Sequence, residues 1–84
     1  MSRYLVVTLR TPAFDPALVG AHYTFLDRLR QAGQLKLAGP FFDHSGGAYL
    51  LHAETLTKAT EIAHGDPLHQ SGSSRITVHE WETR

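Results

Sequence analysis

Two short segments of this chain, residues 3–9 and 48–53, predict β-strands with apolar side chains on both faces. The first reads RYLVVTL and the second AYLLHA, so neither shows the alternation of apolar and polar residues that marks a half-exposed strand. Strands of this kind lie in the interior of a sheet, because other structure must cover both of their faces. The chain is therefore expected to fold around a sheet with these two strands at its centre.

Start and stop signals predict two helices. Asp15, followed by a proline, is typical of a helix N-cap with proline in the first helical position. Gly33 then predicts the end of a first helix over residues 16–32. Thr55 predicts the N-cap of a second, shorter helix, which ends at residues 65–67.

Residues 34–42 and 75–81 predict the remaining two strands, and their polar side chains suit the edges of a sheet. A short turn at residues 43–47 makes the second and third strands an antiparallel hairpin. The element order is then βαββαβ. Right-handed crossovers with one hairpin favour an α+β fold, the ferredoxin-like sandwich with strand order 4-1-3-2.

The length of 84 residues predicts a single domain over residues 1–84. A chain this short buries only about 60–65% of the surface that its unfolded form exposes, so its stability depends on additional support. The sequence has no cysteine, which excludes disulfides and thiolate metal sites and suits a reducing cytoplasm. We therefore expect a cytoplasmic protein without a cystine framework.

A second copy of the chain is the expected source of that support. Two helices cover only one face of the sheet, whereas the central strands are apolar on both. A homodimer formed sheet to sheet would bury the second face. The alternative is a monomer with scattered apolar residues on its exterior.

The charge balance argues against a nucleic acid partner, and the short apolar stretches argue against a membrane partner. Eight basic residues offset eight acidic ones, without a basic run that could neutralise many phosphates. An RNA-binding sheet is suggested by residues 46–50 (GGAYL), but the basic residue and the stacking aromatics of such a sheet are missing. No stretch approaches the roughly 20 apolar residues of a membrane span, and residues 1–10 are too weakly apolar for a signal peptide.

His22 is the first candidate for chemistry. Its spacing from Leu18, Phe25 and Leu26 places it in the apolar stripe of the first helix, so its ring is expected to point toward the sheet. A polar group in that position needs a hydrogen-bond partner. His22 is either a core histidine bonded to a backbone carbonyl or a general acid/base.

Asp66 is the second candidate, in the Gly-Asp-Pro break after the second helix. Ordinary turn chemistry, in which the carboxylate bonds the backbone two residues on, would explain it. If both helices pack on the same sheet face, however, its carboxylate could hold the imidazole of His22 in one tautomer.

Other chemistries have weaker support. His64 and His69 flank Asp66 without any recognised ligand spacing, so no metal site is expected. No serine stands in a nucleophile-elbow setting and no glycine pattern matches a phosphate loop, so neither covalent catalysis nor nucleotide binding is predicted.

The sequence also resembles a known family, the YciI-like (YCII-related) proteins. The resemblance runs from about His22 to Trp81, and Val19 stands where that family often has an arginine. The residues that carry it are His22, Tyr23, Phe25, Leu26, Leu29, Gly33, Leu35, Ala38, Gly39, Pro40, Asp43, Gly46, Gly47, Asp66, Pro67 and Leu68.

This resemblance implies a dimeric α/β barrel in which His22 and Asp66 form a His-Asp dyad in a pocket between helices and sheet. It also implies lyase, dehydrochlorinase-like or isomerase chemistry on a hydroxylated or cyclic organic compound. The leading hypothesis is thus a small homodimeric enzyme that needs no cofactor, with Gly39 and Pro40 where strand backbone could approach the substrate. The alternative is a non-catalytic module that binds a small ligand.

Overall fold

The computed structural model describes residues 2–84 as one four-stranded antiparallel sheet with helices packed on it. The elements in chain order are β1 (Ser2–Arg10), a 3₁₀ turn η1 (Pro16–Leu18), α1 (Val19–Gln31), β2 (Leu35–Pro40), β3 (Gly46–Ala53), α2 (Leu56–His64), α3 (Pro67–Gln70) and β4 (Ser74–Glu80).

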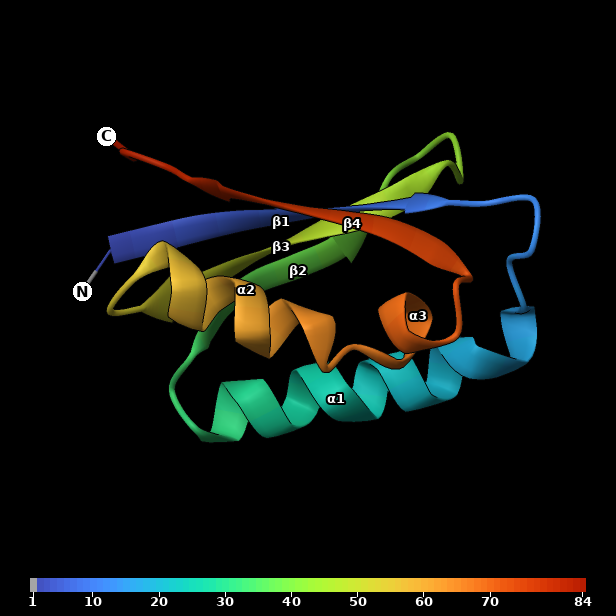
Figure 1. The fold of residues 1–84 in the computed structure, drawn as a ribbon, viewed down its shortest axis with the longest axis horizontal. Coiled ribbons are helices and arrows are strands. Elements are labelled where there is room, and N and C mark those ends of the chain that lie inside the picture. Colours follow the sequence, from blue (N-terminus) through green and yellow to red (C-terminus); the bar gives the residue numbers. More distant parts are fainter. Residues whose placement is uncertain (1) are drawn as a thin grey trace.

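The strand order across the sheet is β2-β3-β1-β4, which places the two strands with apolar residues on both faces at the centre as predicted. Figure 1 shows α1, α2 and α3 together on one face of the sheet, with the other face uncovered. This arrangement is the ferredoxin-like βαββαβ sandwich of dimeric α/β barrel proteins. The expected fold class is therefore confirmed.

The core lies between the helices and the covered face of the sheet. Tyr4 and Val6 of β1 and Leu51 of β3 are almost fully buried there, against Leu26 and Leu29 of α1. These strand residues alternate along the chain, as the two-residue period of a strand requires. Burial of their apolar surface is the main force that holds α1 to the sheet.

The uncovered face carries the other set of side chains from the central strands. Leu5 of β1 stands opposite Leu50 of β3, and Val7 stands opposite Ala48. Leu37 of the edge strand β2 extends this surface and is 68% exposed. The apolar character that the sequence showed on both strand faces thus corresponds to one covered and one uncovered surface.

The helix ends follow the predicted signals, with two differences: the first turn is a 3₁₀ helix, and a short third helix is added. Asp15 accepts a hydrogen bond from the backbone N–H of Ala17 at 2.9 Å, but the first turn is a 3₁₀ helix and the α-helix begins at Val19. The second difference is α3, a single helical turn that was not predicted, because the Gly-Asp-Pro sequence indicated only a break after the second helix. Asp66 is its N-cap, so the break also starts a helix.

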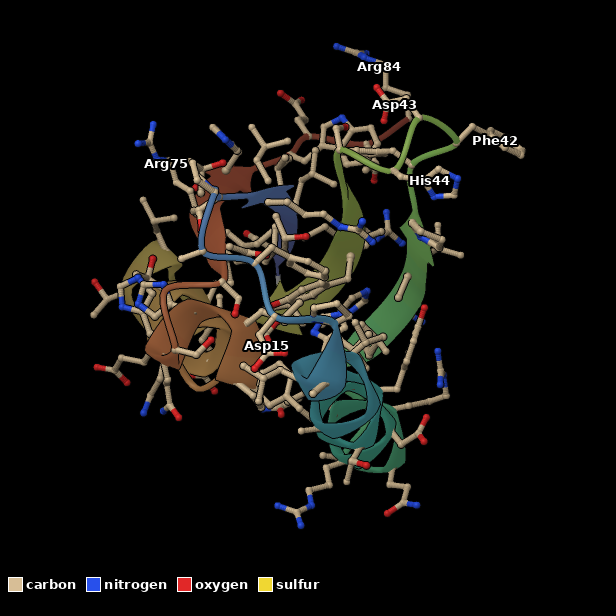
Figure 2. The ribbon with its side chains drawn as sticks, turned by 90° about the vertical axis from the view of Figure 1, so that its right-hand side faces the viewer. Asp15, Phe42, Asp43, His44, Arg75 and Arg84 are labelled. Atoms are coloured by element: carbon tan, nitrogen blue, oxygen red, sulfur yellow. The ribbon has the colours of Figure 1, made fainter. Side chains whose placement is uncertain are left out.

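The β2–β3 turn projects away from the helices. Figure 2 shows Phe42, Asp43 and His44 at its tip, and the Phe42 side chain is fully exposed. Behind the turn the two strands approach closely, because Gly47 has no side chain to separate them. A Cβ at Gly47 would lie 2.6 Å from the carbonyl oxygen of Gly39.

Over residues 2–84, the helices are too short and too polar to cross a membrane.

Candidate active site

The carboxylate of Asp66 lies at the junction of α2, α3 and the sheet, and its side chain is fully buried. Oδ1 accepts a hydrogen bond from the backbone N–H of Leu68 at 2.9 Å, which caps the single turn of α3. This is the bond that ordinary turn chemistry predicted. It uses only part of the hydrogen-bonding capacity of the carboxylate, so the remaining lone pairs need other donors.

His22 supplies one of these donors. It is the fourth residue of α1, and its Nδ1 lies 2.9 Å from both carboxylate oxygens of Asp66. An ionised carboxylate can only accept hydrogen bonds, so Nδ1 carries the proton and donates it. The structure therefore brings together the two residues that the sequence singled out, 44 positions apart in the chain.

The second nitrogen of His22, Nε2, makes no hydrogen bond to any residue within 2–84. The His22 side chain retains 14% of its exposure and lines the pocket described below. With the proton on Nδ1, Nε2 carries the free lone pair of the ring. The ring is thus arranged to accept a proton there.

Tyr49 of β3 is a third member of this cluster, and the sequence did not identify it. Its hydroxyl donates a hydrogen bond to Oδ2 of Asp66 at 3.1 Å. Burial, together with the neighbouring charge of Asp66, raises the pKa of the Tyr49 hydroxyl far above its usual range. The hydroxyl stays protonated and remains a donor. Tyr49 alternates with Leu51 along β3, so both side chains lie on the face of the sheet that the helices cover.

A pocket opens between the N-terminal end of α1 and the ends of β1, β2 and β3. The volume open to water-sized groups is about 60 Å³. Since one water needs roughly 10–15 Å³ of such space, the pocket accommodates a molecule of a few heavy atoms. Its lining includes Thr8, Arg10, Phe14, Val19, His22, Tyr23, Leu26, Gly39, Pro40, Gly47, Tyr49 and Leu68.

Gly39 and Pro40, predicted to approach a substrate, are thus part of the same lining as His22. Two further lining residues, Arg10 and Phe14, had no signal in the sequence. The guanidinium carbon of Arg10 lies 4.2 Å from the centroid of the Phe14 ring, in cation–π geometry. Arg10 ends β1 and Phe14 lies in the connection from β1 to η1, so these two side chains reach the pocket from different parts of the chain.

The other histidines lie elsewhere. His64 and His69 stack in parallel with their ring centroids 4.2 Å apart. Within residues 2–84, no group of three or more His, Cys, Asp or Glu side chains is placed to hold a metal ion. His52 and His79 are on β3 and β4, which are not neighbours, and His44 is in the exposed β2–β3 turn.

The match to known proteins covers nearly the whole chain. The family model of the YCII-related domain matches residues 3–82. The chain belongs to the YCII-related family. A relative within it is the uncharacterized protein YjpA of Bacillus subtilis (strain 168), which is 49% identical over 84 residues, covering 100% of this chain and 99% of YjpA.

Among solved structures, the chain is similar to 5-chloro-2-hydroxyhydroquinone dehydrochlorinase (TftG) from Burkholderia phenoliruptrix, in complex with 2,5-dihydroxybenzoquinone. The TM-score is 0.77 with 18% sequence identity, and the alignment covers 98% of this chain and 95% of TftG. At this identity the similarity establishes a common fold. It agrees with the family match in assigning the ferredoxin-like architecture.

Proposed function

We propose that this YCII-related protein is a small homodimeric enzyme that moves a proton on a hydroxylated or cyclic organic substrate, with His22 as the general acid/base and Asp66 as its partner. The observation that carries the proposal is the His22–Asp66 contact at the wall of a pocket. A single histidine oriented by a carboxylate can remove a proton and return it, so the step requires no cofactor.

Each member of the cluster has a distinct task in this mechanism. Asp66 holds the Nδ1–H of His22 and stabilises the imidazolium that forms when Nε2 accepts a proton. Tyr49 and the Leu68 N–H hold the carboxylate in place. Because Asp66 is fully buried, its charge acts on His22 with little screening by water.

The proposed substrate is small and has an acidic C–H bond, from which His22 would take the proton. The pocket volume of about 60 Å³ takes only a few heavy atoms, so a ring would enter by one edge, and the pocket wall combines apolar side chains with a few polar groups. TftG, which shares the fold, is a dehydrochlorinase whose structure holds 2,5-dihydroxybenzoquinone. By analogy, an elimination or isomerisation on a hydroxylated ring is the favoured reaction class for this chain.

The homodimer is supported by the uncovered face of the sheet. Leu5, Leu37 and Leu50 lie together on it, and Trp81 lies beside them. Leu37 and Trp81 are 68% and 47% exposed. A second copy of the chain, packed sheet to sheet, would remove this apolar surface from water.

Proton exchange in D₂O tests the chemical proposal without knowledge of the complete reaction. We would incubate the protein with small phenols, hydroxyquinones and lactones and follow deuterium incorporation at ring carbons by NMR. His22→Ala and Asp66→Asn are each expected to lower the rate of exchange by about 10²–10⁴-fold. His64→Ala, a change at an exposed histidine outside the pocket, is the matched control and should exchange like the wild type.

Two results would contradict the enzyme proposal. Deuterium exchange that persists in His22→Ala would show that His22 is not the general acid/base. Compounds that raise the melting temperature of the wild type but never exchange would favour the non-catalytic ligand-binding module instead.

A further inference from the structure

Arg10, the last residue of β1, lines the same pocket as His22. Its guanidinium carbon lies 4.2 Å from the centroid of the Phe14 ring. Within residues 2–84 this guanidinium forms no ion pair. Its N–H donors are therefore available to a ligand, while the aromatic ring limits the directions in which they can point.

The charge of the pocket favours an anion. Among the residues that line it, Arg10 carries the one permanent charge and there is no aspartate or glutamate. Asp66 is fully buried behind the imidazole of His22 and is occupied by the donors from His22, Tyr49 and the Leu68 backbone. No lining carboxylate competes for the guanidinium.

We propose that Arg10 binds an anionic oxygen of the substrate, a phenolate or an enolate on a small ring, and that Phe14 positions its guanidinium. This inference rests on the proposed function and names the substrate class for that site. Arginine suits the task because its planar fork can donate two parallel hydrogen bonds to such oxygens.

Arg10 would also stabilise the charge that develops during the reaction. His22 Nε2 takes a proton from a ring carbon, and the electron pair of the broken C–H bond moves through the conjugated system onto a carbonyl oxygen of the substrate, which becomes the enolate or phenolate oxygen beside Arg10. In an isomerisation, His22 returns the proton to another carbon. In an elimination, the electron pair moves back and expels a leaving group as its anion, and His22 gives its proton to solvent.

Equilibrium binding tests Arg10 separately from catalysis. The probe is 2,5-dihydroxybenzoquinone, which carries acidic hydroxyls, and the neutral control is 2,5-dimethoxybenzoquinone, which cannot ionise. Titrations would be followed by NMR in the His22→Ala background, so that no turnover interferes. Arg10→Gln is expected to raise the Kd for the hydroxylated probe by about tenfold or more and to leave the Kd for the methyl ether nearly unchanged.

Arg75→Gln is the matched control, because it makes the same change in net charge. Arg75 lies on β4 outside the pocket, and Figure 2 shows it pointing outward. It should change the Kd by no more than about twofold. Arg10→Lys keeps the charge but loses the planar fork, so its Kd should fall between those of wild type and Arg10→Gln.

Three results would overturn this inference. The first is equal affinity of the His22→Ala protein for both probes, and the second is an unchanged Kd for the hydroxylated probe when Arg10→Gln is added to it. The third is no binding of the hydroxylated probe at millimolar concentration. None of these results depends on proton exchange. A loss of probe binding in Arg10→Gln together with exchange that persists in His22→Ala would support anion recognition while contradicting the acid/base proposal.

Discussion

The hydroxyl of Tyr49 donates a hydrogen bond to Oδ2 of Asp66 at 3.1 Å, from the central strand β3 to the N-cap of α3. The same carboxylate accepts the Nδ1–H of His22 from α1. Three separate elements therefore meet at one buried anion. A buried carboxylate is stable only when such donors replace the water that it loses.

Tyr49→Phe tests how much that donor contributes. The variant keeps the ring but leaves Oδ2 of Asp66 with one donor fewer, so we expect the free energy of unfolding to fall by about 1–3 kcal/mol at neutral pH. Urea denaturation would measure it. Tyr23→Phe, which removes an exposed hydroxyl, should have little effect. Equal losses in both variants would mean that the Asp66 bond adds no stability.

Alkaline pH should weaken the contribution of Tyr49. An unfolded tyrosine titrates near pH 10, whereas burial and then the charge of Asp66 raise the pKa of Tyr49 in the folded protein. Above about pH 10 only the unfolded chain loses this proton, so rising pH favours unfolding. The stabilisation is complete below about pH 10 and is lost as the pH rises beyond it. The difference in unfolding free energy between wild type and Tyr49→Phe should therefore shrink from about pH 9 to pH 11.

Gly47→Ala should destabilise the sheet beside the pocket. A Cβ there would lie 2.6 Å from the Gly39 carbonyl oxygen and 3.1 Å from Cα of Pro40, so β2 and β3 must separate. We expect a loss of about 1–3 kcal/mol, typical of overpacking. Gly39→Ala is the matched control, because a Cβ at that position meets nothing within 4 Å. Thermal unfolding of both variants would show the difference, and equal melting temperatures would contradict the close approach.

The homodimer can be tested with a charge on the uncovered face of the sheet. Wild-type protein should sediment at micromolar concentration with twice the 9.3 kDa mass of the chain. Leu37→Asp should sediment as a folded monomer, because Leu37 is largely exposed in the single chain and its aspartate would be desolvated only by a partner. Leu56→Asp makes the same change at the start of α2, on the helical side, and should remain dimeric. A wild type that sediments only at 9.3 kDa would contradict the dimer.

The local features of the fold could be predicted from the sequence because they depend on neighbouring residues. The strands with two apolar faces are the central ones, and Thr55 caps α2 by accepting a hydrogen bond from the Lys58 N–H at 3.1 Å. The spacing of His22 within an apolar stripe predicted an inward-facing ring, and in the structure the side chain retains only 14% of its exposure. The family match then agreed with the fold inferred from these patterns.

The order of the four strands and the two longer helices, the sheet and two candidate residues thus follow from local patterns, since period and turn chemistry act over a few positions. The contacts of Asp66 with His22, 44 positions away, and with Tyr49, 17 positions away, arise from tertiary packing. The same packing places Arg10 over the ring of Phe14 in the lining of the pocket. These contacts depend on how the helices and the β1–η1 loop pack against the sheet, and no local pattern specifies that packing.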